Sequence, residues 1–109
     1  MSNPLLQRVR HVVFHRPGPN WKLGVDFREQ ERVGEHVQHY LKLHMQGKLE
    51  LGGPFLLQDA GGMMVAAKNV SREELEAFAA EDPAILSRLL VFEIRSWLTA
   101  MEHKRIEGP

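Results

Sequence analysis

Three of the six histidines of the chain lie in one stretch, Gly34-Glu35-His36-Val37-Gln38-His39-Tyr40-Leu41-Lys42-Leu43-His44-Met45-Gln46-Gly47. It predicts a helix, because apolar and semi-polar side chains recur at helical spacing. The predicted stripe that packs on a sheet consists of Val33, Val37, Tyr40, Leu41 and His44. Gly47 ends the helix, since glycine is favoured just past a helix end. His36 falls at the edge of the stripe, where its ring can reach into a cleft bordered by the helix.

Length and composition limit the class of protein. A chain of 109 residues predicts a single domain over 1–109, with a core at about 9–98 between a polar leader and a charged tail. Basic and acidic residues balance at 14 each, without a basic cluster, so we expect no nucleic-acid partner. No signal-peptide pattern or apolar run of about 20 residues occurs, which predicts a soluble, cytoplasmic protein without a membrane segment. The absence of cysteine excludes disulfides and thiol catalysis.

The segment before the central helix predicts a strand and a long loop. Val9 to His15 is rich in β-branched and aromatic residues, and alternation places His11, Val13 and His15 on one face. Proline and glycine end this strand, and a loop runs from about Arg16 to Arg28. The loop carries Trp21 and Phe27. It is either a lid over a cleft or a segment whose rings plug the end of the core.

The segment after the central helix predicts three strands and a second helix. The expected strands are 48–51, 63–68 and 89–97, and the expected helix is 72–80. Ser71 and Glu74 form a capping box at the start of this helix, which directs Leu75, Phe78 and Ala79 inward. The second and third strands form an antiparallel hairpin.

The order strand, helix, strand, strand, helix, strand predicts a ferredoxin-like α+β domain, an antiparallel sheet with both helices on one face. The other face is then free. We expect it to be half-apolar and to comprise His11, Val13, His15, Val91, Glu93, Arg95 and Trp97, with part of the second and third strands. A surface of this kind requires a partner, and the simplest is a second copy of the chain in a two-fold homodimer.

Several short motifs occur in a characteristic order along the chain. They are His36 in the first helix, Gly53-Pro54 after the second strand, Gly61-Gly62, Asp82-Pro83 after the second helix, and Arg95-Ser96-Trp97 at the end of the last strand. The set resembles the YciI-like (YCII-related) family, and Pro17-Gly18-Pro19-Asn20-Trp21 resembles one branch of it. The similarity covers about His11 to Trp97.

The resemblance implies a dimeric α/β barrel with a cleft on each protomer that holds a histidine and an aspartate close together. By position these are His36 and Asp82. The candidate ligand-binding residues around them are Tyr40, Trp21, His11, Arg95, Gly53 and Pro54. One position departs from the family, since members often have an arginine where this chain has Val33, and Arg32 stands one place earlier.

The implied chemistry is acid–base catalysis without a cofactor. A histidine exchanges protons near neutral pH, and a carboxylate fixes its tautomer and stabilises the imidazolium. No cysteine or Gly-x-Ser-x-Gly elbow offers a nucleophile. We therefore expect an isomerase, lyase or elimination reaction on a small, cyclic or aromatic, organic molecule, with His36 as base and Asp82 as its orienting partner.

Other interpretations of these residues stay open. Asp82-Pro83 is also an ordinary helix start, with aspartate as N-cap and proline at the first helical position, and this role is compatible with catalysis. Tyr40 is either a ligand contact or a core aromatic. The chain can also be a binding or regulatory module that holds a small molecule in the same cleft without turnover. A purely structural dimer ranks last.

The histidines do not predict a metal site. His36 and His39 are offset by about 60° on the helix, which points His39 toward solvent. His11 and His15 lie about 13 Å apart on one strand face, too far to chelate together. His44 is expected to be a hydrogen-bonded core residue.

Overall fold

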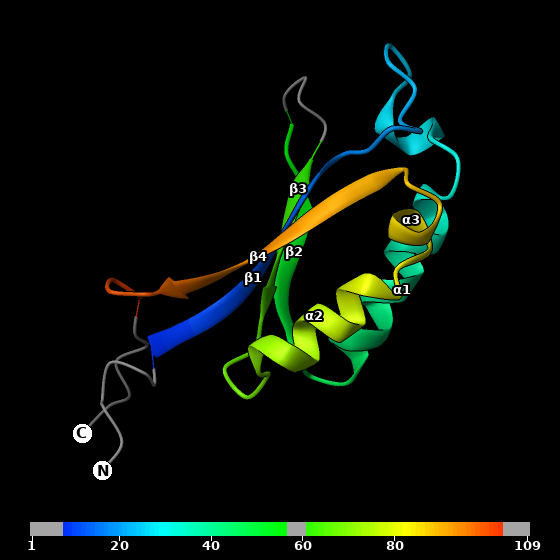
Figure 1. Cartoon of the computed structure of the whole chain (residues 1–109). Coiled ribbons are helices and arrows are strands. Elements are labelled where there is room, and N and C mark those ends of the chain that lie inside the picture. Colours follow the sequence, from blue (N-terminus) through cyan, green and yellow to red (C-terminus); the bar gives the residue numbers. More distant parts are fainter. Residues whose placement is uncertain (1–7, 57–60, 104–109) are drawn as a thin grey trace, which may run out of the picture.

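Four strands form one antiparallel sheet in the order β2-β3-β1-β4, and the helices lie against one of its faces (Figure 1). The structure, a computed structural model, describes residues 8–56 and 61–103. Its elements are β1 (Val9–Pro17), the 3-10 helix η2 (Phe27–Glu29), α1 (Val33–Met45), β2 (Leu49–Pro54), β3 (Gly62–Ala66), α2 (Arg72–Ala80), α3 (Pro83–Leu86) and β4 (Leu90–Leu98). This α+β arrangement is compatible with the predicted ferredoxin-like fold.

The predicted bounds of the helices and strands agree best with the structure where a local hydrogen bond sets them. Helix α2 has its predicted span, and Ser71 Oγ accepts the Glu74 N–H at 3.0 Å. This is the first half of the expected capping box, and the carboxylate of Glu74 binds Lys48 at 2.6 Å. Strand β1 continues past His15 to Pro17, which pairs with Leu90. The expected leader and the end of the charged tail lie outside the described residues.

The buried face of α1 differs from the predicted stripe. His36, His39, Tyr40 and Leu43 are its buried residues, whereas Val37 and Leu41 are 55% and 44% exposed. His44 is also exposed, so its expected place in the core is wrong. The predicted stripe follows apolar character alone. Histidine rings are buried here because they find polar partners inside the protein. His39, expected to point to solvent, donates from Nε2 to the Phe78 carbonyl at 2.7 Å.

The residues of β1 that share a face with those of β4 differ from the prediction. Val13 pairs with Ile94, and His15 pairs with Phe92. Residues directly opposite each other share a face, and Val13 packs with α1 and α2 residues in the main core. His11, Val13 and His15 therefore lie on the helix-covered face, which corrects their expected place. The free face carries Arg10, Val12 and Phe14 instead, together with Val91, Glu93, Arg95 and Trp97 as expected.

Ion pairs cross the free face. Arg10, only 7% exposed, contacts both Glu50 and Glu102. The Arg95 guanidinium lies over the Phe14 ring at 4.8 Å and pairs with Glu93 at 3.1 Å. Apolar area remains between them, because Val91 and Trp97 are 41% and 49% exposed. The free face is therefore a mixed surface.

Hydrogen bonds hold the long loop near both of its ends. The Gly18 N–H donates to the Leu89 carbonyl at 2.8 Å, and the buried Gln30 amide donates to the carbonyls of Lys22 and Val25. Trp21 packs against a second small core of Ala84, Leu89 and Leu90. Of the two interpretations of this loop, the packing of Trp21 favours the second, in which the ring fills the end of the core.

Within the part of the chain that the structure describes, no helix has both the length and the apolar character needed to cross a membrane.

A buried histidine–aspartate–histidine cluster

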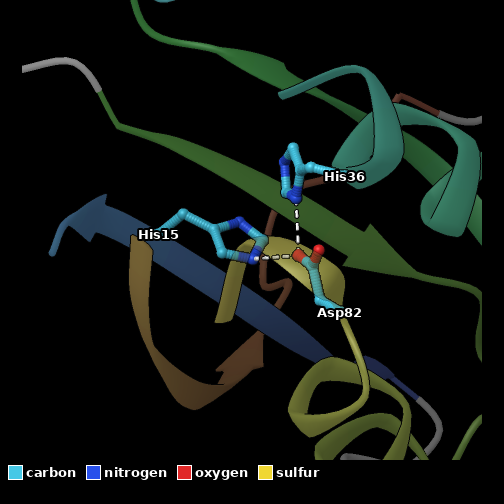
Figure 2. Close-up of side chains that lie close together, drawn as sticks. All are labelled: His15, His36 and Asp82. Atoms are coloured by element: carbon cyan, nitrogen blue, oxygen red, sulfur yellow. Dashed lines mark hydrogen bonds and ion pairs between the residues drawn. The ribbon is translucent and has the colours of Figure 1, made fainter. Parts of the chain in front are cut away.

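Three titratable side chains from three separate elements meet beneath the helices (Figure 2). His15 comes from β1, His36 from the first turn of α1, and Asp82 from the residue before α3. The Asp82 Oδ2 atom lies 2.5 Å from His36 Nδ1 and 3.9 Å from His15 Nε2. We call these three residues the His–Asp–His cluster. His15 and Asp82 are 2% and 0% exposed, so the carboxylate is enclosed between two imidazoles.

Asp82 is held by the helix that it caps. Its Oδ1 atom accepts the Ala84 N–H at 2.9 Å, and Pro83 occupies the first turn of α3. Each carboxylate oxygen thus has its own role, one as N-cap and one toward the histidines. The N-cap alternative raised from the sequence is confirmed, and it coexists with the histidine contact.

Burial and hydrogen bonding act in opposite directions on this carboxyl group. Burial by itself raises the pKa of Asp82, but the hydrogen bond and charge of His36, the Ala84 N–H and the charge of His15 together hold it below its usual value. Burial, followed by the neighbouring charge of Asp82, raises the pKa of Tyr40. Asp82 is therefore an anion at neutral pH, and Tyr40 keeps its proton.

His15 is an uncharged imidazole at neutral pH. Burial, and next the charge of His36, lower its pKa to about 4 against the opposing effect of Asp82. The Tyr40 hydroxyl lies 3.4 Å from His15 Nε2, and this hydroxyl can donate to Nε2 or accept from it. The second ring nitrogen of His15 is Nδ1. That Nδ1 atom is buried and has no hydrogen-bond partner within the described residues.

Protonation of His15 should make the fold less stable in mild acid. Its folded pKa of about 4 is below the unfolded value of 6.5, so the unfolded chain binds a proton first as the pH falls. Stability is then complete above about pH 6.5 and is lost progressively toward pH 4, by roughly 3 kcal/mol in total. Urea denaturation across this range should show a clearly flatter pH dependence in His15→Gln than in the wild type, whereas the exposed-site control His44→Gln should keep the wild-type slope. Equal slopes in all three proteins would contradict the assignment.

The tautomer of His36 follows from its contact with Asp82. An ionised carboxylate only accepts, so His36 Nδ1 donates and Nε2 carries the lone pair. The side chain makes no second hydrogen bond within the described residues and is 11% exposed, against 2% for His15. His36 is thus the member of the cluster with a free basic nitrogen and some access to solvent.

On the side of α1, the rings of the cluster pack against Tyr40, and Tyr40 in turn packs against His39. The rings of His15 and His36 meet edge-on at 4.8 Å between centroids, and Tyr40 lies 5.5 Å and 5.4 Å from them. His39 stacks on Phe78 at 3.9 Å and contacts Tyr40 edge-on. This packing holds the His15 and His36 rings in fixed orientations.

The structure brings only one predicted ligand-binding residue, Tyr40, to the pair of His36 and Asp82. Trp21 lies in the second core, and His11 binds the Ser96 hydroxyl at 3.0 Å farther along the helix-covered face. Arg95 lies on the free face. Gly53 and Pro54, expected after the second strand, lie at the end of β2, and β3 separates β2 from β1 in the sheet. Arg32 pairs with Glu35 at 3.1 Å on the surface.

His15 belongs to the cluster, although sequence reasoning placed it on the free face. A signal was available in its strand, since His15 alternates with Val13, a purely apolar residue suited to a core. The deciding information was the pairing of β1 with β4, which no local pattern contains.

The surface near the cluster is shallow. Two open hollows of about 380 Å³ and 430 Å³ occur among the described residues, and none of the three cluster residues lines either. The larger is lined by sequence neighbours of the cluster, including Glu35, His39 and Pro83. Neither of these two hollows is the cleft that the family resemblance implies around His36 and Asp82.

Comparison of the sequence with protein-family models and with curated proteins found no match in either case. His15, His36 and Asp82 also form a group able to hold a metal ion, since their ligand atoms all lie within 4.8 Å of one another.

Proposed function

We propose that this protein is a small enzyme that abstracts a proton from a carbon acid, with His36 as the base and Asp82 as its orienting partner. The reaction class is isomerisation, elimination or a lyase reaction on a small, cyclic or aromatic, organic molecule. The resemblance to the YciI-like family points to the same pair of residues.

One observation carries this proposal. Asp82, completely buried, accepts from His36 Nδ1 at 2.5 Å and so directs the lone pair of Nε2 away from itself. A buried carboxylate behind an imidazole stabilises the imidazolium that forms when Nε2 takes a proton. His15 is a weak base, because burial lowers its pKa to about 4, and the neighbouring Tyr40 keeps its proton because burial raises its pKa. Neither competes for the role of base.

The test is an exchange experiment that needs no knowledge of the product. The protein is incubated in deuterated buffer with a panel of small lactones, 2-oxo acids and unsaturated cyclic acids, and loss of the C–H signal is followed by proton NMR. We expect at least one compound to exchange with the wild type and with His44→Gln, and to lose most of this exchange with His36→Gln. Exchange that is independent of His36 would overturn the proposal.

A second candidate function is a binding or regulatory module without turnover. The observation that favours it is that the larger hollow is lined by Glu35, His39 and Pro83 and not by His36 or Asp82, so a ligand held there lies beside the pair without touching it. In the same NMR experiment this function predicts ligand-induced shifts of protein signals without any deuterium exchange of the ligand.

We also propose that two copies associate through their free sheet faces into a dimeric α/β barrel. The exposed Trp97 and Val91 support this, as does the family resemblance. A competing apolar surface exists on α1, where Val37, Leu41 and Met45 are exposed at helical spacing.

The dimer is testable by sedimentation equilibrium. Trp97→Glu should shift the protein toward monomer, because it places a charge in the proposed interface, and Met45→Glu should leave the mass unchanged. A monomeric wild type would contradict the dimer. Dissociation by Met45→Glu alone would assign the interface to α1.

A further inference from the structure

We propose that the His–Asp–His cluster binds one divalent transition-metal ion, and that the bound ion blocks His36 as a base. The second part rests on the proposed function, whereas the first part does not. The ligands are His15 Nε2, His36 Nδ1 and Asp82 Oδ2.

The three atoms converge on one small volume. Both histidines turn a ring nitrogen toward the same carboxylate oxygen (Figure 2), at 2.5 Å and 3.9 Å, and all ligand atoms lie within 4.8 Å of one another. Metal–nitrogen and metal–oxygen bonds of about 2.0–2.2 Å place neighbouring ligand atoms roughly 3–4 Å apart. Coordination of one ion therefore requires the 2.5 Å contact between His36 Nδ1 and Asp82 Oδ2 to lengthen and His15 Nε2 to approach from 3.9 Å.

The donor set is one that first-row divalent ions prefer. Two imidazoles and one carboxylate suit zinc, cobalt and iron, and three protein ligands leave positions for water. His15 turns its Nε2 atom toward the carboxylate, at 3.9 Å from Asp82 Oδ2. A coordinating imidazole presents a lone pair on that nitrogen and carries its proton on the other.

Neighbouring groups support the three ligands. The Ala84 N–H holds Asp82 Oδ1 at 2.9 Å, which leaves Oδ2 for the ion. The Tyr40 hydroxyl, 3.4 Å from His15 Nε2, loses that contact when Nε2 coordinates and becomes available to a water on the ion. Such partners orient metal ligands in proteins. The ion also supplies positive charge beside a completely buried carboxylate.

Metal binding changes the tautomer of His36. In the metal-free protein the proton is on Nδ1 and the lone pair is on Nε2. When Nδ1 coordinates the ion, its proton leaves and a neutral ring carries its proton on Nε2 instead. The atom that acts as base in the proposed function is then a donor, and the metal-bound protein cannot abstract a proton through it.

The test uses the full chain, stripped of metal with a chelator, and titrates it with Co²⁺ and with Zn²⁺. Cobalt absorption in the visible range and calorimetry should both give one ion per chain for the wild type. His15→Gln and Asp82→Asn should each weaken binding by more than the roughly 10–100-fold typical of losing an outer partner. His44→Gln, which removes an exposed histidine, should bind like the wild type. Circular dichroism checks the fold of every variant, and if one ligand variant fails to fold, the other carries the test alone.

The outcomes separate the two proposals. Binding that is absent from the wild type, or unchanged in both ligand variants, overturns the metal site whatever the exchange activity shows. If one equivalent of Zn²⁺ binds and suppresses the deuterium exchange of the proposed function, both parts hold. If Zn²⁺ binds but exchange continues undiminished, the tautomer argument is wrong. If Zn²⁺ binds and no compound exchanges even without metal, the proposed function fails while the site stands.

Discussion

Replacing Asp82 by alanine should lower the free energy of unfolding by roughly 1.5–5 kcal/mol, because the substitution removes a helix cap and a buried hydrogen-bond acceptor. Two losses add here. The Ala84 N–H loses its cap, which costs roughly 0.5–2 kcal/mol, and the buried His36 Nδ1 donor loses its acceptor, which costs about 1–3 kcal/mol more. The measurement is urea or guanidinium denaturation near neutral pH.

A matched variant separates the cap from the cluster. Ser71→Ala removes another N-cap, that of α2, at a site without buried histidines, and should cost only about 1 kcal/mol. Asp82→Asn keeps the size of the side chain and a capping oxygen, so its cost should fall between the two. If Asp82→Ala costs no more than Ser71→Ala, Asp82 is a helix cap and nothing else.

Replacing His36 by glutamine should slow the proton exchange of an active compound by about 10²–10⁴-fold, the usual contribution of a positioned general base. Glutamine retains an amide that can still bond to Asp82, so the fold should survive, but it has no lone pair of comparable basicity. The effect should appear in the rate at saturating substrate. A change confined to the concentration dependence would indicate that His36 only binds.

Asp82→Asn offers the companion measurement. The amide is uncharged, so it holds the imidazole without stabilising the imidazolium, and a large loss of rate is expected while His36 stays in place. A rate close to that of the wild type in Asp82→Asn would contradict the partnership, even if His36 proved essential.

The sequence predicted the features that local chemistry determines. Helix α2 begins after Ser71 because its hydroxyl caps the Glu74 N–H, and α3 begins at Pro83 because Asp82 caps it. The order of elements followed from alternation and helical spacing, which are short-range patterns. The antiparallel pairing of β2 with β3 was also correct, since a short connection leaves few alternatives.

Long-range register and buried polar groups were harder to predict. The alternation within β1 was correct, but only its pairing with β4 decides that His15 joins Phe92 on the helix-covered face. The buried face of α1 was missed for a related reason. A scale of apolar character ranks Val37 and Leu41 above the two histidines of this face. His36 and His39 are nevertheless buried, because their hydrogen-bond partners lie 46 and 39 residues away, respectively.

The pairing of β1 with β4 has a consequence for how the chain acquires its structure. Nine successive residue pairs join the first strand to the last, from Val9 with Leu98 to Pro17 with Leu90. Contacts between such distant segments close large loops and slow folding. During synthesis, β1 leaves the ribosome long before either of its neighbours in the sheet exists. His15 and His36 therefore emerge well before Asp82, and the cluster can assemble only after synthesis has passed the start of α3.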